Sequence, residues 1–341
     1  MGSASTDARV AVVGATGAVG REMIKVLEER EFPVAELRLF ASARSMGEEL
    51  LFRGRTIDVE LLDEDSPGDL DLVLFSAGGD VSREFAPLFA EAGAVVIDNS
   101  SAWRMDPEVP LVVPEVNPDA IALATGGKKI IANPNCSTIQ LVVALAPLAE
   151  AFGLRRVIVS TYQSVSGAGQ KGIEELSGQV VAMFNQKDRV VDKFPHAIAF
   201  NCIPAIGPFR ADGYSQEEWK LVEESRKILG RPDLKVTPTA VRVPTFACHG
   251  ESIVAELDKP ITAAAVRREL KVADGVVVRD TPADEEYPMG LDLAGTDEVF
   301  VGRIRRDPFD DHSVAMWVVA DNLRKGAAVN AVQIAEAVWM A

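Results

Sequence analysis

The chain has 341 residues, which is enough for two domains with separate hydrophobic cores. Its net charge of −16 argues against a nucleic-acid-binding surface, and no uncharged apolar stretch is long enough to predict a membrane span. Three widely spaced cysteines and three histidines argue against a disulfide framework and against a zinc site, so we expect a cytoplasmic protein without a bound metal.

A strand, a glycine-rich turn and a helix follow one another near the start of the chain. The β-branched run at 10–13 leads into Gly14-Ala-Thr-Gly-Ala-Val-Gly20, and a helical pattern comes next. Glycines allow a pyrophosphate to approach the backbone, and N–H groups at the helix start bind it. The spacing GxxGxxG differs from GxGxxG, and a tight turn without a ligand is the alternative interpretation. We predict a dinucleotide site that includes Gly14 and Gly17.

The second predicted strand, at 36–40, bears on the choice of cofactor. NAD sites usually place an acidic residue after this strand to bind the ribose 2′-hydroxyl. Here Ser42, Arg44 and Ser45 follow instead. An arginine with flanking hydroxyls suits a 2′-phosphate, so we predict NADP, with an exposed loop arginine of no function as the alternative.

Strands and helices then continue to alternate. Strands are predicted at 71–75 and 94–97, with a helix at 81–91 between them, and the polar residues 98–101 follow the second strand. Open α/β sheets bind ligands just beyond the carboxyl ends of their strands. The first part of the chain therefore predicts a Rossmann-type, doubly wound sheet.

Cys136 lies where a loop turns into a helix. Pro134 biases Asn133 away from helical geometry, and the apolar run at 137–152 is long enough for a buried helix. Unpaired N–H groups and the helix dipole favour the thiolate over the thiol at such a position, which makes it a nucleophile. The alternative is a small buried residue that fills the helix start.

The second half predicts an α+β domain with a mixed or antiparallel sheet, because it has several strands and fewer helices. A strand at 157–162 leads to the polar, glycine-rich segment 163–170. Further strands are predicted at 235–243, 252–257, 276–279, 299–306 and 313–319, with helices at 172–185, 217–229 and 263–270. A last helix, at 325–340, is expected to pack back on the first domain.

Arg242 and His249 place a permanent cation and a titratable imidazole seven residues apart. The arginine suits a substrate carboxylate, and the histidine suits proton transfer, although a histidine without a functional role is the alternative. Cys248 competes with Cys136 as the reactive thiol. We discount it because neighbouring residues in a strand point to opposite faces.

Ser215 and Glu218 have the spacing of a capping box that opens the helix at 217–229. On the same helix, Glu217 and Lys220 are three residues apart. Taken by themselves they predict a surface ion pair that stabilises the helix by a few tenths of a kcal/mol.

Five motifs together resemble the aspartate-semialdehyde dehydrogenase family. They are GATGAVG at 14–20, PNCST at 134–138, QSVSGAG at 163–169, RVPTFACHGE at 242–251 and DNLRKGAA at 321–328, in the order in which the family has them. The resemblance implies NADPH-dependent reductive dephosphorylation of L-4-aspartyl phosphate to L-aspartate 4-semialdehyde, in lysine, threonine, methionine and isoleucine biosynthesis. N-acetyl-γ-glutamyl-phosphate reductase is the nearest alternative, but we expect a Gly-Cys-Tyr-Pro-like motif there.

The resemblance also implies a role for each matching residue. In catalysis, Cys136 forms the thioester, His249 is its acid/base partner and Gln163 orients the acyl group. At the substrate, Arg242 binds the carboxylate, Glu217 the amine, and Arg104, Asn135 and Lys220 the phosphate. Contacts to the cofactor are implied for Thr16, Gly17, Ala18, Val19, Arg44, Ser45, Ser166, Gly167 and Asn322.

The family match completes the expected organisation. It implies an NADP-binding domain at 1–135, a catalytic and dimerisation domain at 136–320, a C-terminal helix at 321–341 and a homodimer. We also expect N–H groups at the helix start to stabilise the oxyanion, and a nearby His249 imidazolium to favour the Cys136 thiolate.

Overall fold

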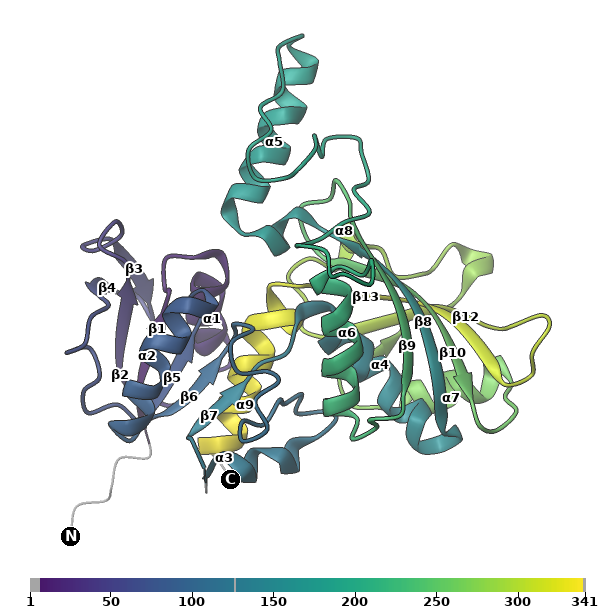
Figure 1. Ribbon diagram of the computed structural model, residues 1–341, viewed down its shortest axis with the longest axis horizontal. Helices are drawn as coiled ribbons and strands as arrows, with labels where there is room; N and C mark the ends of the chain where they lie inside the picture. The colour runs from purple at the N-terminus through teal and green to yellow at the C-terminus, as the bar shows by residue number, and fades with distance from the viewer. Residues whose placement is uncertain (1–6, 126, 340–341) are drawn as a thin grey trace. The chain divides into compact units, whose positions relative to one another are not determined.

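Two compact units make up the protein. The computed structural model describes residues 7–125 and 127–339. One unit, called the first unit here, consists of the chain up to Pro134 together with the segment from Ala327 onward; the second unit is Asn135–Gly326. Helices and strands of both are labelled in Figure 1.

The first unit is built on a seven-stranded sheet in the order β3-β4-β2-β1-β5-β6-β7, in which only β3 runs antiparallel to its neighbour. Its strands are β1 Ala8–Val13, β2 Val34–Ala41, β3 Glu49–Phe52, β4 Arg55–Leu61, β5 Leu72–Phe75, β6 Val95–Asp98 and β7 Ile130–Ala132. Its helices are α1 Ala18–Glu29, α2 Gly79–Glu91, α3 Ala122–Thr125 and α9 Val329–Trp339, with a 3-10 turn at Pro118–Ile121.

Both faces of this sheet are covered, which confirms the predicted doubly wound fold. Val10 and Val12 of β1 belong to the core that includes residues of α1 and α9. On the opposite face, Phe89 of α2 packs against Phe40 and Phe75, with ring centroids 6.0 and 6.4 Å apart. Alternating side chains of each strand thus supply two cores, as buried parallel strands require.

The second unit is built on a six-stranded mixed sheet in the order β11-β12-β13-β10-β8-β9. Its strands are β8 Leu154–Gln163, β9 Lys235–Arg242, β10 His249–Leu257, β11 Val276–Val278, β12 Val299–Arg306 and β13 Ser313–Ala320. Its helices are α4 Cys136–Phe152, α5 Gln170–Phe184, α6 Gln216–Ile228, α7 Ala263–Lys271 and α8 Gly290–Leu293, with 3-10 turns at Val165–Ala168 and Pro282–Asp284. A π-helical turn, Arg324–Ala328, leads into α9.

Strand register brings three of the predicted site residues to one end of this sheet. Gln163, the last residue of β8, is paired with Arg242, the last residue of parallel β9. On its other side β8 is antiparallel to β10, so β10 begins with His249 where β8 ends. Helix α4 packs on β8 and β10 and starts at Cys136.

Two details of the sequence prediction were wrong. The strands β3 and β4 and the strand β7 were missed; β3 and β4 are joined by Arg53 and Gly54, whose φ values of 50° and 73° form a tight hairpin turn. Strand β10 begins at His249 and not at residue 252, because pairing with β13 continues to Ala320. The predicted end of the last helix, Met340, lies outside the described residues.

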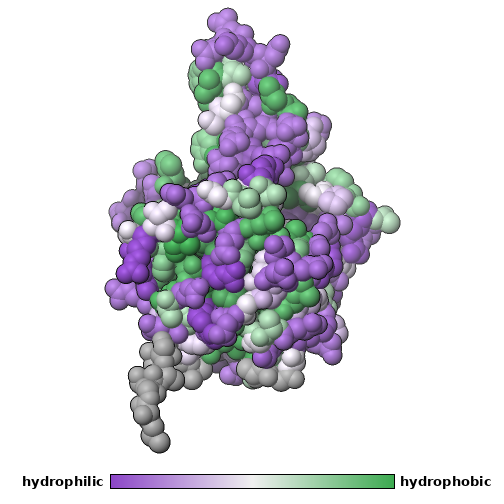
Figure 2. Space-filling view, turned by 90° about the vertical axis from the view of Figure 1, so that its left-hand side faces the viewer, coloured by the Kyte–Doolittle hydropathy of each residue, from purple (hydrophilic) through white to green (hydrophobic). Residues whose placement is uncertain are grey.

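The face in Figure 2 mixes hydrophilic residues with hydrophobic ones between them. Within the second unit, α5 and the loop that follows extend away from the sheet (Figure 1). Phe184, at the end of α5, is 78% exposed. Among the described helices, none combines the length and the apolar character needed to cross a membrane.

Candidate active site

Cys136 is the first residue of α4, and its neighbour Asn135 is the N-cap. The Asn135 Oδ1 accepts hydrogen bonds from the N–H groups of Ser137, at 3.0 Å, and Thr138, at 3.3 Å. This cap fixes the direction in which the helix starts and therefore the position of Cys136. The Ser137 and Thr138 N–H groups already have an acceptor, so the expectation that they stabilise an oxyanion is wrong for these two donors.

Gly326 lies directly against Cys136. A Cβ atom at Gly326 would be 2.9 Å from the Cys136 Cβ and 3.4 Å from its Cα, so only glycine fits there without displacing the cysteine. Gly326 was not among the predicted site residues, although it lies in the motif at 321–328. The signal was a glycine within an otherwise helical run, which often marks a close approach of two backbones.

Helix α6 anchors Asn135 from the other side. The Asn135 Nδ2 donates to Glu217 Oε1 at 2.9 Å, and the Asn135 N–H donates to Glu224 Oε2 at 2.7 Å. Glu217 and Glu224 are seven residues apart, which places them on one face of the helix. The predicted capping box of Ser215 and Glu218 is confirmed and fixes the start of α6.

The predicted ion pair of Glu217 with Lys220 is confirmed, but its placement at the surface is wrong, because Glu217 is buried. Its Oε2 accepts from Lys220 Nζ at 2.9 Å, and the glutamate is only 8% exposed. Burial alone would raise the pKa of Glu217, but Lys220, the hydrogen bond from Asn135 and the charge of Arg242 lower this pKa to about 2. Glu217 therefore stays ionised at neutral pH.

Gln163 and Arg242 extend this group of residues. Gln163 Nε2 lies 3.3 Å from both Glu217 Oε1 and Thr161 Oγ1. Arg242 is buried, donates from Nη1 to the Ser164 carbonyl at 2.7 Å, and interacts electrostatically with Cys136. A guanidinium, an ammonium and a carboxylate are thus gathered around the start of α4.

His249 is uncharged at neutral pH. It is fully buried, and burial followed by the charge of Arg242 lowers the pKa of His249 to about 3. The backbone N–H of Ser164 donates to its Nδ1 at 3.2 Å, and an N–H group cannot accept, so the proton of the neutral ring is on Nε2. The expectation of a His249 imidazolium is wrong for the free protein.

Nε2 of His249 has no hydrogen-bond partner within the described chain. It borders Gly167, where a Cβ atom would lie 3.2 Å from Nε2 and 3.0 Å from Arg242 Nη1. The predicted cofactor residues Ser166 and Asn322 meet on the other side of the ring: Asn322 Nδ2 donates to Ser166 Oγ at 2.9 Å, and Ser164 Oγ donates to Asn322 Oδ1 at 3.0 Å. Ser164, which was not among the predicted site residues, connects this buried network to His249.

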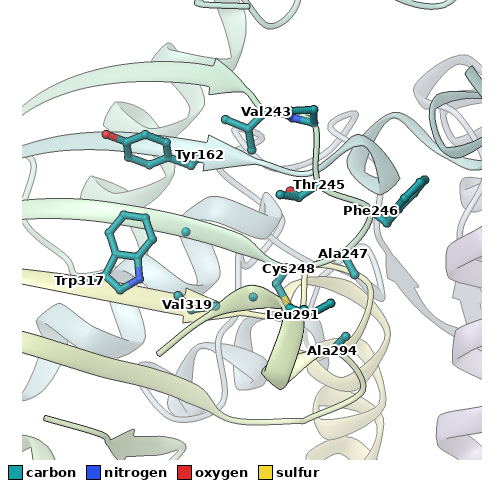
Figure 3. Close-up of a pocket in the computed structure, with 13 residues that line it drawn as sticks. Tyr162, Val243, Thr245, Phe246, Ala247, Cys248, Leu291, Ala294, Trp317 and Val319 are labelled. Atoms are coloured by element: carbon teal, nitrogen blue, oxygen red, sulfur yellow. The ribbon is translucent and has the colours of Figure 1, made fainter. Parts of the chain in front are cut away.

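Cys248 has a different environment. It lines an apolar cavity of about 550 Å³ with Tyr162, Phe246, Leu291 and Trp317, whereas His249 does not (Figure 3). Burial, with a smaller contribution from the charge of Asp321, raises the pKa of Cys248 to about 12. A thiol with such a pKa is a poor nucleophile at neutral pH.

The glycine-rich turn of the first unit has the geometry of a phosphate-binding loop. A Cβ atom at Gly14, where φ is +79°, would lie 2.8 Å from the Ser76 carbonyl oxygen. The N-cap of α1 is Gly17, which has no side chain to occupy the helix N–H groups, and Ala18 and Val19 begin the helix.

The remaining predicted residues of the first unit lie in two places. Thr16 Oγ1 donates to Ser45 Oγ at 3.2 Å, which ties the turn to the loop after β2, where Ser42 and Arg44 are exposed. Arg104 is buried and donates to the carbonyl oxygens of Asn99 and Asn133, each at 3.0 Å.

The second unit therefore combines a thiol at a helix start, an uncharged N–H donor and fixed charges of both signs. Such a group can bind a small substrate that carries an amine and a carboxylate, and can attack its carbonyl carbon with sulfur. The first unit supplies a turn that suits a dinucleotide.

Comparison with known proteins agrees with this class of chemistry. The family model described as semialdehyde dehydrogenase, NAD binding domain, matches residues 9–124, and that described as semialdehyde dehydrogenase, dimerisation domain, matches residues 145–325. Fold and site thus define a semialdehyde dehydrogenase, an NAD(P)-dependent oxidoreductase.

Individual relatives narrow the class. Aspartate-semialdehyde dehydrogenase of Aquifex aeolicus is 57% identical over 330 residues, 96% of this chain and 97% of the relative. The crystal structure of aspartate semialdehyde dehydrogenase II from Vibrio cholerae, complexed with ASA, has a TM-score of 0.94 at 49% identity and covers 97% of this chain and 98% of that one. The Candida albicans enzyme with NADP has a TM-score of 0.75 at 28% identity, with coverage of 97% and 98%. The chain belongs to the aspartate-semialdehyde dehydrogenase family.

Replacing Gly326 by Ala should displace Cys136. The new methyl group overlaps the cysteine, and a shift of about 1 Å in a reacting group costs up to about 100-fold in rate. Because the displaced sulfur moves away from the helix start and from Arg242, which favour its thiolate, we expect alkylation of Cys136 by iodoacetamide to slow about tenfold. Gly178→Ala in α5 is the control, because a Cβ there has no atom within 4 Å. Equal alkylation rates in both variants would contradict the contact.

The buried neutral His249 should make the folded state sensitive to acid. The unfolded chain protonates this histidine near pH 6.5, whereas the folded protein does so only near pH 3. Its contribution to stability is therefore complete above pH 6.5 and is lost as the pH falls from there towards 3. Between pH 7 and pH 5 it amounts to about 2 kcal/mol of unfolding free energy.

Denaturant unfolding of His249→Asn at pH 7 and at pH 5 measures this contribution to the unfolding free energy. The variant should lose about 2 kcal/mol less than the unsubstituted protein between pH 7 and pH 5. His196→Asn, at an exposed position, is the control and should behave like the unsubstituted protein. Parallel losses in all three proteins would show that His249 is not held neutral.

Proposed function

We propose that the protein catalyses the reductive dephosphorylation of L-4-aspartyl phosphate to L-aspartate 4-semialdehyde with NADPH, in the cytoplasm. The proposal rests on the position of Cys136, which is the first residue of α4. Its neighbour Asn135 caps this helix and donates a hydrogen bond to the ionised Glu217. The family membership and the ASA complex of the Vibrio cholerae relative support the substrate.

In the first step Cys136 acts as the nucleophile. Its sulfur attacks the acyl carbon, a C–S bond forms, and the C–O bond to the phosphate breaks, so that a thioester and inorganic phosphate result. The start of α4 and the charge of Arg242 favour the thiolate. Gln163 orients the acyl group from the end of β8.

In the second step the thioester is reduced. When bound, NADPH supplies the hydride. The Nε2–H of His249 is a hydrogen-bond donor for the oxyanion that forms at the former carbonyl, and this tautomer follows from the Ser164 N–H at Nδ1. Collapse of the thiohemiacetal then breaks the C–S bond, releases the aldehyde and returns the Cys136 thiolate.

The charged residues would recognise the two ends of the substrate. Arg242 is the partner for the carboxylate, because its planar fork forms two parallel hydrogen bonds. Glu217, ionised above a pKa of about 2, is the partner for the amine. Lys220, Arg104 and Asn135 are assigned to the phosphate by their match to the family motifs.

The residues of the glycine-rich turn fit a dinucleotide, and the loop after β2 favours NADP over NAD. Gly14 leaves room at the turn, and the α1 N–H groups face no capping side chain. Thr16, Gly17, Ala18 and Val19 would contact the pyrophosphate, and Ser42, Arg44 and Ser45 the 2′-phosphate. Ser166, Gly167 and Asn322 keep the cofactor role that the family match implies.

The activity is tested by following NADPH oxidation at 340 nm with L-4-aspartyl phosphate. Turnover should depend on this substrate, and N-acetyl-γ-glutamyl phosphate should give none. Cys136→Ser should lose at least about 1,000-fold in kcat, because a hydroxyl cannot replace the thiolate at neutral pH. Cys202→Ser and Cys248→Ser are the matched controls and should keep most of the activity. An active Cys136→Ser protein would overturn the assignment.

Arg44 is tested separately. Arg44→Ala should raise the KM for NADPH about tenfold or more, through loss of a charge-assisted contact, and should leave the KM for NADH nearly unchanged. Arg53→Ala, in the β3–β4 turn, is a control at another arginine of the same unit. A similar change for both cofactors in Arg44→Ala would remove the argument for NADP.

We also propose that the protein is a homodimer through the second unit. The outer face of the six-stranded sheet exposes Ile158 and Tyr162, each more than a third accessible, and the matching family model is described as a dimerisation domain. Sedimentation should give twice the mass of one chain, and Ile158→Asp should shift the protein towards the monomer. A monomer at micromolar concentration would contradict this.

A further inference from the structure

Two further polar side chains, Gln140 and Glu251, lie on the same helix and strand as Cys136 and His249. Gln140 follows Cys136 by four residues on α4, so the two share a face of the helix. Glu251 follows His249 by two residues on β10, so these two share a face of the sheet. Helix α4 packs on β10, and the Gln140 side chain interacts with that of Glu251 there.

Neither side chain has another partner. Glu251 is fully buried and Gln140 is 1% exposed. The Glu251 oxygens and the Gln140 Oε1 and Nε2 make no hydrogen bond to any third residue of the described chain, and the only side chain that interacts with Glu251 by hydrogen bonding is Gln140. Four buried polar atoms without partners would cost several kcal/mol, and an ionised carboxylate without a cation would cost more.

One proton on Glu251 satisfies all four atoms. A carboxylic acid and a primary amide form a ring of two hydrogen bonds, in which the acid O–H donates to the amide oxygen and the amide N–H donates to the acid carbonyl. An ionised carboxylate has no donor for the Gln140 oxygen. Burial raises the pKa of Glu251 well above its usual range, and the Gln140 side chain is the one neighbour that acts against this rise.

We propose that Glu251 is an uncharged carboxylic acid that pairs with the Gln140 amide and thereby positions Cys136 relative to His249. The pair joins α4 to β10 directly behind the two residues, so it fixes how far the helix start lies from the imidazole. A second connection runs through Thr161, which pairs with Glu251 across the sheet and whose Oγ1 accepts from Gln163. Glu251 and Gln140 are positioning residues and do not touch the substrate.

Infrared spectroscopy tests the protonation state without any assay of activity. At pH 7 the unsubstituted protein should show a carbonyl band of a protonated carboxylic acid that shifts in D2O and is missing from Glu251→Gln. Glu218→Gln is the control, because that carboxylate accepts the Ser215 N–H in the capping box and should contribute no such band. No difference between Glu251→Gln and the unsubstituted protein in this region would overturn the uncharged state.

Kinetics test the positioning role, which rests on the proposed function. Glu251→Gln keeps two hydrogen bonds with Gln140 and should retain kcat within about threefold. Glu251→Leu should lower kcat about tenfold or more with little change in KM, because the contact is remote from the substrate. Gln140→Leu should do the same, and the double variant should be no slower than either single one.

Ile253→Ala is the matched control for a general loss of packing. Ile253 is the next inward residue of β10 and is fully buried, so this variant should lose stability with kcat unchanged. A kcat for Glu251→Leu that equals that of Ile253→Ala, or a Glu251→Gln protein as slow as Glu251→Leu, would refute the positioning role. Absence of aspartyl phosphate reduction by the unsubstituted protein would instead refute the proposed function and leave the infrared result to decide the pairing.

Discussion

The hydrogen bonds of Asn135 are the interactions on which the site depends. Its side-chain oxygen caps α4, while its amide nitrogen and backbone N–H are held by Glu217 and Glu224 of α6. The residue that starts the helix is thus tied to a second helix on the same side of the sheet. Cys136 follows at once in the chain, so its position is set by rigid elements and not by a loop.

Each titratable group around Cys136 keeps a single protonation state near neutral pH. Lys220 and Arg242 keep Glu217 ionised despite its burial, whereas burial, together with the charge of the same Arg242, keeps His249 neutral. A neutral imidazole with its proton on Nε2 is a donor. This donor can stabilise an oxyanion. Since the imidazole carries no charge, Arg242 and the helix start are the groups that favour the Cys136 thiolate.

Much of this arrangement could be predicted from the sequence. Periodicity gave the alternating strands and helices, and Pro134 with the apolar run after it placed Cys136 at a helix start. Gly326 and Ser164 could not be assigned, because their roles come from contacts between segments far apart in the chain. The protonation state of His249 could not be predicted either, because it depends on burial, which the sequence does not show. The pairing of Gln140 with Glu251 likewise depends on the register of α4 against β10.

The central claim is that Cys136 carries the acyl group. Mixing the protein with L-4-aspartyl phosphate in the absence of NADPH and measuring the intact mass, followed by peptide mapping, tests it most directly. The account predicts one aspartyl group per chain, attached to Cys136 through a bond that hydroxylamine cleaves, with release of one equivalent of phosphate. An acyl group found on Cys248, or turnover with NADPH without any acylated Cys136, would contradict it.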